Sequence, residues 1–229
     1  MIFHIPTDEL LFPPVHFAEE SGLLGIGGDL SPERLLLAYR SGIFPWYNPE
    51  EPILWYSPDP RMVLFLENIR ISHSMKKVLR QGHFTITLDK AFPAVMKACA
   101  LIKRNGQSGT WIGTDIYNAY CRLHQMGYAH SVEVWEGETL VGGLYGVALG
   151  QYFCGESMFS YRTNASKAAF ISLAQLLRER GFQFIDCQIY TPHLESLGAE
   201  EISRDHFLTL LQQAIPLNNS PQQWQNWLP

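Results

Sequence analysis

The chain has 229 residues, 46% hydrophobic and 17% charged, which is typical of a globular protein large enough for one or two domains. It contains no uninterrupted apolar run near the roughly 18 residues of a membrane span, and its first residues lack the basic segment and cleavage site of a secretory signal. A formal net charge of −5 excludes a surface that is basic throughout, but it is compatible with a local basic patch for nucleic acid. The four cysteines show no CxxC spacing, which favours reduced thiols in a cytoplasmic protein.

Residues 1–60 are rich in proline and aromatic residues, and we expect them to form a small N-terminal domain. Ser31 and Pro32 begin a helix within it, because serine caps helix starts and proline needs no NH at the first position. Gly42 ends that helix. The segment that follows, IFPWYNPEEPILWYSPDP, holds five prolines and predicts a rigid loop without regular structure. The earlier GIGGD run matches no phosphate-binding motif and predicts only a turn.

Residues 61–215 show the alternating pattern of an α/β (α+β) domain, and residues 216–229 are polar and predict a flexible tail. The predicted strands are 61–66, 83–88, 130–136, 139–150, 151–160 and 182–188, with a hairpin turn near Gly137. The predicted helices are 74–80, 91–104, 114–126, 166–181 and 203–214.

Polar side chains interrupt two of these apolar strands. Glu156 lies in FCGESMFS, and Asp186 and Gln188 lie in FIDCQ. Burying such groups without partners costs about 2–7 kcal/mol for a neutral amide and more for a charge, so they indicate the mouth of a site. Side chains two apart share a strand face, so Asp186 and Gln188 should point together and Cys187 away from them, into the core.

A hairpin, a polar strand, a helix and a second polar strand follow one another along the chain. This order of elements resembles the acyl-transfer half of the GCN5-related N-acetyltransferase (GNAT) fold. That fold has a mixed, mostly antiparallel sheet flanked by helices, and its acetyl-CoA enzymes hold pyrophosphate on a glycine-rich loop at the start of the helix. Residues 160–167 occupy this position and read SYRTNASK, without a glycine. The donor is therefore expected to be something other than a CoA thioester.

Long motifs spread over nearly the whole chain resemble one family, the leucyl/phenylalanyl-tRNA–protein transferases. These motifs are LLGIGGDLSPERLLLAYRSGIFPWY, WYSPDPR, GTWI, AYCRLHQMGYAHSVEVW, LVGGLYGV, FCGESMFS, NASK, IDCQ and HLESLGAEEISR. The resemblance implies a bacterial aminoacyltransferase that moves Leu or Phe, and less readily Met, from aminoacyl-tRNA to the N-terminal Arg or Lys of a protein. The product would be an N-degron that marks the protein for degradation under the N-end rule.

The implied chemistry needs no cofactor, because an amine that attacks an activated ester gives an amide without ATP or a metal. The family's catalytic pair falls on Asp186 and Gln188. We expect the Gln188 carbonyl to accept a hydrogen bond from the attacking amine, while Asp186 orients that amide and stabilises developing positive charge. Glu156 is the hypothesised recogniser of the basic acceptor residue, since Arg or Lys needs a counter-charge.

Three further groups of residues are predicted to contact the donor. The apolar pocket for its side chain is assigned to Leu144, Met158, Phe170, Leu173, Leu177 and Ile185. The aromatic residues expected near the terminal adenosine are Tyr39, Trp46, Trp111 and Tyr120. The cations expected to hold tRNA phosphates, which share one side of a predicted helix, are Lys76, Lys77 and Arg80. Thr191 departs from the Asn of the family pattern, which puts a role for that side chain in doubt.

Competing hypotheses use fewer of these features. A Cys–His hydrolase would need Cys187 on the same face as the site and paired with His193. A CoA-dependent N-acyltransferase fits the fold but lacks the glycine loop. A catalytically silent tRNA-binding module explains the basic helix but leaves Asp186 and Gln188 without a purpose. We expect a monomer that has aminoacyl-tRNA and N-terminal Arg or Lys peptides as partners and no membrane association.

Overall fold

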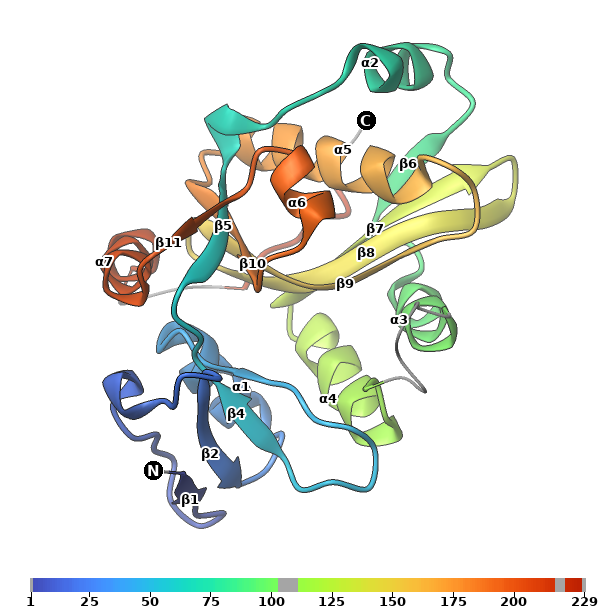
Figure 1. Ribbon diagram of the computed structural model, residues 1–229. Coiled ribbons are helices and arrows are strands. Elements are labelled where there is room, and N and C mark those ends of the chain that lie inside the picture. Colours follow the sequence, from blue (N-terminus) through green and yellow to red (C-terminus); the bar gives the residue numbers. More distant parts are fainter. Residues whose placement is uncertain (1, 103–110, 217–220, 228–229) are drawn as a thin grey trace.

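The computed structural model describes residues 2–102, 111–216 and 221–227, and it contains two sheets with helices packed around them (Figure 1). A four-stranded sheet belongs to the first 60 residues, and a seven-stranded sheet belongs to the rest. The predicted α/β class, with a mixed and mostly antiparallel main sheet flanked by helices, is confirmed. Among the described residues, no helix combines the length and apolarity that a membrane crossing requires.

The small sheet has the strand order β1-β2-β4-β3. Its elements are β1 (Phe3–Ile5), η1 (Val15–Phe17), β2 (Leu23–Gly27), α1 (Pro32–Arg40), β3 (Phe44–Pro45) and β4 (Leu54–Tyr56). Two predictions are wrong here. Residues 25–27 of the expected turn belong to β2, and the proline-rich segment contributes two short strands. Pro45 is compatible with a sheet because β3 is an edge strand, where the missing NH breaks no ladder.

The start of α1 follows the sequence prediction. Ser31 Oγ accepts a hydrogen bond from the Arg34 backbone NH at 3.4 Å, and Pro32 occupies the first helical position. Gly42 follows the helix with a φ of +73°, and a Cβ there would lie 2.9 Å from the Leu208 side chain. Glycine at this position therefore lets the end of α1 approach the last helix closely.

The main sheet has the order β11-β5-β10-β9-β8-β7-β6. Its strands are β5 (Arg61–Phe65), β6 (Thr85–Leu88), β7 (Ala129–Glu136), β8 (Thr139–Leu149), β9 (Tyr152–Ser160), β10 (Phe184–Gln188) and β11 (Glu200–Ile202). Within this sheet, as far as the structure describes it, β9 and β10 are the one parallel pair, and their pairing ends at Cys154 opposite Asp186. Strand β9 continues to Ser160 beside β8 alone, so the sheet opens between β9 and β10.

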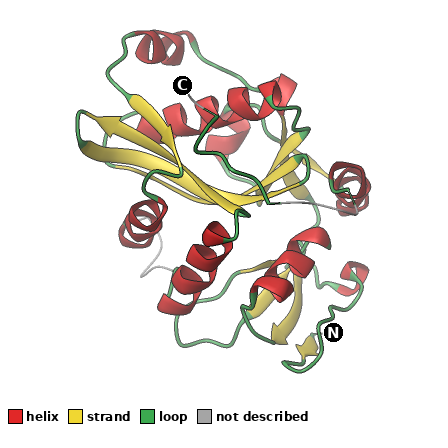
Figure 2. Cartoon of the chain, turned by 180° about the vertical axis from the view of Figure 1, so that it is seen from behind, coloured by secondary structure: helices red, strands yellow, loops and turns green. Residues whose placement is uncertain are grey.

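Helices cover both faces of the main sheet, with α5 (Ala165–Glu179) on one face and α3 (Phe92–Leu101) and α4 (Thr114–Gln125) on the other (Figure 1). The remaining helices are η2 (Leu66–Asn68), α2 (His73–Arg80), α6 (Pro192–Ser196) and α7 (Arg204–Ala214). Figure 2 shows the same layers from behind. The sequence did not predict β11 or α6, because three to five residues are too few for a periodic pattern. The predicted helix over 91–104 ends at Leu101, and residues 103–104 lie outside the described part.

The C-terminal segment packs against the domain, in contrast to the expected flexible tail. Trp224 is 0% exposed, and its ring stacks on His130 with centroids 4.2 Å apart. The Gln222 backbone NH donates to the Gly127 carbonyl at 2.8 Å, which fixes the approach of this segment. Residues 221–227 therefore contribute to the core on the α5 side of the sheet.

Replacement of Trp224 by Ala should lower the free energy of unfolding by about 3–5 kcal/mol, because a large buried ring is removed and a cavity is left. Urea unfolding followed by circular dichroism would measure it. Gln225→Ala, one residue away and exposed, is the matched control and should have little effect. Equal stability of the two variants would show that the tail does not support the fold.

Candidate functional site

A cavity of about 460 Å³ opens where strands β9 and β10 separate. Its wall is contributed by the small N-terminal unit, both central strands, α5 and the segment that leads into α6. The lining residues are Phe44, Pro45, Trp46, Trp111, Leu144, Tyr145, Phe153, Gly155, Glu156, Ser157, Met158, Phe170, Leu173, Ile185, Cys187, Gln188, Ile189, Thr191, His193 and Leu194. This set includes two of the three polar strand residues that the sequence singles out, Glu156 and Gln188.

One end of the cavity is apolar and faces α5. Five residues of the predicted donor pocket line it, namely Leu144, Met158, Phe170, Leu173 and Ile185. Phe170 and Leu173 lie one helical turn apart on α5, and Ile185 approaches from β10. The sixth predicted residue, Leu177, is fully buried in the adjoining core and does not line the cavity.

The other end of the cavity is polar and centres on the Glu156 carboxylate. Oε1 accepts hydrogen bonds from the Tyr39 hydroxyl at 2.8 Å and from Gln188 Nε2 at 2.9 Å. Oε2 accepts from the Tyr120 hydroxyl at 3.2 Å, and the two tyrosine hydroxyls contact each other. Burial raises the pKa of Glu156 to about 7, although the hydrogen bonds from the two tyrosines lower it. The carboxylate therefore exchanges a proton near neutral pH.

Gln188 has an unusual backbone for a residue with a side chain. Its φ is +65°, and the pairing of β10 with β5 shifts register between Asp186 and Gln188. The Asp186 carboxylate stabilises this bulge by accepting from the Gln188 backbone NH at 2.9 Å. The Gln188 amide nitrogen donates to Glu156 and, at 3.4 Å, to Cys154 Sγ, which leaves its carbonyl oxygen for another partner.

Asp186 does not line the cavity, because it forms a buried ion pair with Arg61. Arg61 Nε donates to Oδ1 at 2.8 Å and Arg61 Nη2 donates to Oδ2 at 2.7 Å, and both side chains are 1% exposed. The Arg61 guanidinium also donates to the Gly42 carbonyl at 3.2 Å and lies over the rings of Phe44 and Phe207. The negative charge of Asp186 is thus compensated, in a bidentate geometry that is strong when desolvated.

Cys154 on β9 lies between the carboxylates of Glu156 and Asp186. Its thiol is 3.2 Å from Asp186 Oδ2 and 3.5 Å from Glu156 Oε1. Burial, followed by the nearby charges of Asp186 and Glu156, raises the pKa of the Cys154 thiol well above its usual value. The thiol therefore stays protonated and can donate to either carboxylate.

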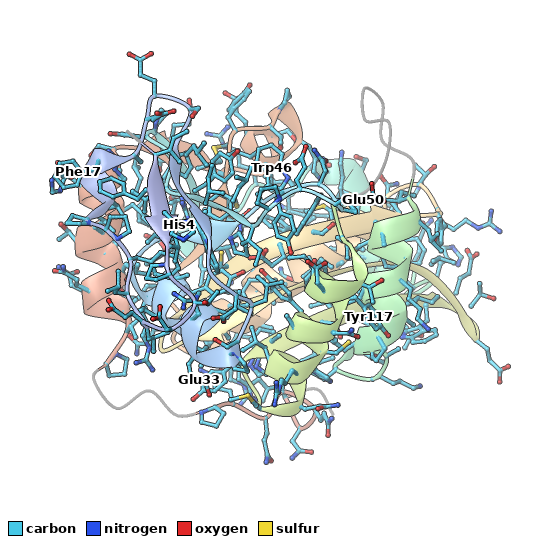
Figure 3. The ribbon with its side chains drawn as sticks, turned by 90° about the horizontal axis from the view of Figure 1, so that it is seen from below. His4, Phe17, Glu33, Trp46, Glu50 and Tyr117 are labelled. Atoms are coloured by element: carbon cyan, nitrogen blue, oxygen red, sulfur yellow. The ribbon has the colours of Figure 1, made fainter. Side chains whose placement is uncertain are left out.

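The four predicted adenosine-contacting aromatics divide into two groups. Trp46 and Trp111 line the cavity, and Trp46 is 38% exposed in the segment after β3, where Figure 3 labels it. Tyr39 and Tyr120 are buried behind Glu156, and their rings offer no face to the cavity. Their positions correspond to support of the carboxylate rather than to stacking on a base.

The prediction that the Cys187 thiol points away from the site is wrong. Cys187 lines the apolar end of the cavity beside Ile185. The alternation along β10 is as predicted, but the cavity extends to the α5 side of the strand. The thiol is 3.8 Å from the Ile185 carbonyl, and burial raises its pKa far above the usual value, so a Cys–His hydrolase with His193 lacks a thiolate.

The segment after β10 places Thr191 and His193 at the cavity. Thr191 Oγ1 accepts from the Leu194 backbone NH at 3.2 Å and so caps α6, a task that threonine and asparagine both perform. Burial, followed by the charge of Lys167, lowers the pKa of His193 below its ordinary value of 6.5. His193 is therefore neutral at physiological pH.

The three predicted tRNA-binding cations lie on α2, with Lys76, Lys77 and Arg80 exposed and Met75 buried beneath them. They do not line the cavity. Figure 1 shows α2 on the same side of the main sheet as α5.

Sequence reasoning missed Arg61 and Cys154 as parts of the site. A single Arg at the head of the apolar run RMVLFL was a usable signal, because an unpaired buried charge is costly. Cys154 carried no such signal, since buried cysteine is common in strands.

Arg61→Met should lower the free energy of unfolding by about 3–5 kcal/mol, because it leaves the Asp186 charge buried without a partner. Adding Asp186→Asn should cost less than the sum of the two single changes, which a double-mutant cycle in urea would measure. Arg162→Met breaks the exposed pair with Glu136 and is the control, with little expected effect. Strictly additive losses would mean that Arg61 and Asp186 are not coupled.

The chain matches two family models along most of its length. Residues 63–212 match the leucyl/phenylalanyl-tRNA protein transferase family, and residues 28–59 match the N-terminal domain of the same family. Among curated proteins, a leucyl/phenylalanyl-tRNA–protein transferase of Syntrophobacter fumaroxidans is 56% identical over 96% of this chain and 94% of its own length. One from Flavobacterium johnsoniae is 58% identical over 89% of this chain and 96% of its own length.

Solved structures are less similar. L-PGS from Bacillus licheniformis gives a TM-score of 0.46 at 12% identity, over 86% of this chain and 74% of that one. A GCN5-related N-acetyltransferase-like protein from Streptococcus suis gives 0.37 at 13% identity, over 71% and 60%. The sequence matches are long and specific, and they show that the chain belongs to the leucyl/phenylalanyl-tRNA protein transferase family.

Proposed function

We propose that this protein transfers Leu or Phe, and less readily Met, from aminoacyl-tRNA to the N-terminal Arg or Lys of acceptor proteins. The observation that carries the proposal is one cavity with an apolar end for the donor side chain and a polar end that holds Glu156 and Gln188. A wall of Leu, Met, Phe and Ile accepts several apolar side chains, because each methylene changes the free energy by only about 1–3 kcal/mol.

The amine that attacks the ester is expected to be held by Gln188. The amide nitrogen of Gln188 is committed to Glu156 and Cys154, so the carbonyl oxygen is the atom that can accept from an amine. Asp186 supports this arrangement indirectly, by holding the Gln188 backbone, because its own charge is paired with Arg61. We therefore assign Asp186 to positioning and Gln188 to contact with the acceptor.

Recognition of the nucleic acid is assigned to two surfaces. Trp46 and Trp111 at the cavity can stack on the terminal adenine, which is worth about 1–3 kcal/mol per base. Lys76, Lys77 and Arg80 on α2 are exposed and can contact phosphates of the tRNA.

The N-terminal Arg or Lys of the acceptor protein brings a positive charge to the cavity. Glu156 is the only carboxylate among the described residues that line the cavity.

The proposed product is an N-degron with Leu or Phe at its start, made by a cytoplasmic monomer. The cytoplasmic location is supported by Cys121, Cys154 and Cys187, which carry reduced thiols rather than disulfides. A CoA-dependent reaction is disfavoured by the start of α5, where Ser160 Oγ accepts from the Ser166 backbone NH at 3.3 Å and no glycine loop exposes amides to a pyrophosphate.

The direct test mixes purified protein with labelled Leu-tRNA and an Arg-initiated peptide, and in parallel with acetyl-CoA and the same peptide. Label from Leu-tRNA should appear at the peptide N-terminus, and acetyl-CoA should give nothing. Gln188→Ala should lower kcat, by an increase of roughly 2–4 kcal/mol in the activation free energy, while leaving tRNA binding intact. Acetylation, or tRNA binding without transfer, would contradict the proposal.

Met158→Ala should lower use of Leu by up to about 1–3 kcal/mol in kcat/KM and spare Phe, because the enlarged pocket suits the bulkier ring. Competition between Leu-tRNA and Phe-tRNA in one reaction gives the ratio. Leu177→Ala is the comparison, since Leu177 is buried outside the cavity and should cost stability without changing the ratio. An unchanged ratio in Met158→Ala would place Met158 outside the donor pocket.

A further inference from the structure

The Glu156 carboxylate is held in one orientation by three elements that are far apart in the chain. Tyr39 from α1, Tyr120 from α4 and Gln188 from β10 all donate to it. Burial, followed by the Glu156 charge, raises the pKa of both tyrosines well above 10, so they stay protonated and donate. These three donors fix the position and orientation of the carboxylate.

The other two polar residues are poorly suited to take a proton from an attacking amine. Asp186 has both oxygens engaged, by Arg61, the Gln188 backbone NH and Cys154, and it does not line the cavity. An amide such as that of Gln188 is essentially non-basic. Glu156 lines the cavity, and its Oε2 accepts only the Tyr120 bond at 3.2 Å among the described residues.

Geometry also brings Glu156 next to the place assigned to the amine. Gln188 Nε2 lies 2.9 Å from Glu156 Oε1, so the amide edge and the carboxylate are adjacent. An amine that donates to the Gln188 carbonyl oxygen lies beside this carboxylate, within reach of a second hydrogen bond.

We infer that Glu156 is the general base of the reaction, which takes a proton from the acceptor amine and returns it to the leaving ribose oxygen. This inference rests on the proposed aminoacyl transfer. The amine lone pair attacks the ester carbonyl carbon and forms the C–N bond, while one N–H proton passes to the Glu156 carboxylate. The C–O bond to the ribose then breaks, and the same proton passes to that oxygen, which leaves a free tRNA hydroxyl and an ionised Glu156.

Among the ionisable groups around Glu156 that are named here, Glu156 itself is the one that changes its protonation near neutral pH. Tyr39, Tyr120 and Cys154 have raised pKa values and stay neutral, Asp186 is paired with Arg61, and His193 across the cavity has a lowered pKa. Burial raises the Glu156 pKa to about 7, which is close to the ideal for a base at that pH. The base form exists above this pKa, so the rate should rise as pH increases through about 7.

The test measures single-turnover transfer from Leu-tRNA at saturating peptide between pH 5.5 and 8.5. The transfer rate of the wild-type protein should rise with pH in a step near pH 7, where Glu156 ionises. A second rise should come from the acceptor amine at roughly 7.7–8.0. Glu156→Gln should slow transfer by about 100-fold or more and keep only the rise that belongs to the amine. The loss should be equal for peptides that begin with Arg, Lys or a neutral residue.

Tyr120→Phe tests whether the rise in rate near pH 7 belongs to Glu156. It removes a hydrogen bond that lowers the Glu156 pKa, so this rise should move to higher pH and the rate should recover there. A variant that merely damaged the fold would lower the rate at every pH and leave this rise in place.

A thermal denaturation series would test whether Glu156→Gln is folded. The folded pKa of Glu156, about 7, lies above the unfolded value of roughly 4.3, so wild-type stability falls as pH rises between them. The variant has no such loss, and its Tm relative to wild type should therefore rise from pH 5 to pH 8.

Three outcomes would overturn the inference. Loss confined to Arg and Lys peptides would make Glu156 a recogniser of the side chain, and an unchanged rate would exclude both roles. An unmoved pH dependence in a Tyr120→Phe variant that keeps the wild-type Tm would assign the step near pH 7 to another group. Inactive wild-type protein would instead contradict the proposed function itself.

Discussion

The buried ion pair between Arg61 and Asp186 is the constraint on which the rest of the site depends. Removing two ions from water costs several kcal/mol each, and only excellent geometry offsets that cost. Here the contact is bidentate, the guanidinium also reaches the Gly42 carbonyl, and the rings of Phe44 and Phe207 flank it. The pair therefore joins the small N-terminal unit, β5, β10 and α7 at one point.

The shape of the cavity follows from where this pair sits. Asp186 is the last residue of β10 in register with β9, and its carboxylate holds the Gln188 backbone in a left-handed conformation immediately beyond. A residue other than glycine in that conformation stores roughly 1–3 kcal/mol of strain, which the surrounding contacts must maintain. The two strands consequently part at Asp186, and the opened edge gives one cavity a polar end and an apolar end.

The two carboxylates near this point have different chemical characters. Asp186 has its charge compensated by a guanidinium, while Glu156 is held by neutral tyrosine donors that compensate its burial only in part. Cys154 lies between them as a protonated thiol and links the structural pair to the titratable group. A carboxylate with a pKa near 7 destabilises the folded state when ionised, which is the usual trade between stability and a reactive site.

Much of the local structure could be predicted from the sequence, because it depends on neighbouring residues. The Ser31 cap of α1, the strands of the main sheet other than β11 and the common face of Phe170 and Leu173 follow from capping, alternation and helical spacing. The family motifs and the polar residues in apolar strands also located Glu156 and Gln188 in advance.

Partners were decided only by the tertiary structure, since periodicity gives the face on which a side chain lies and not what it meets there. Arg61 and Asp186 are 125 positions apart, and Tyr39 and Glu156 are 117 apart, so strand order and helix packing alone bring them together. For the same reason, strict alternation along β10 correctly opposed Cys187 to Asp186, yet it did not reveal that the cavity reaches both faces. Composition suggested a flexible tail, but the free energy gained by burying Trp224 against His130 depends on a surface that exists only after the sheet has formed.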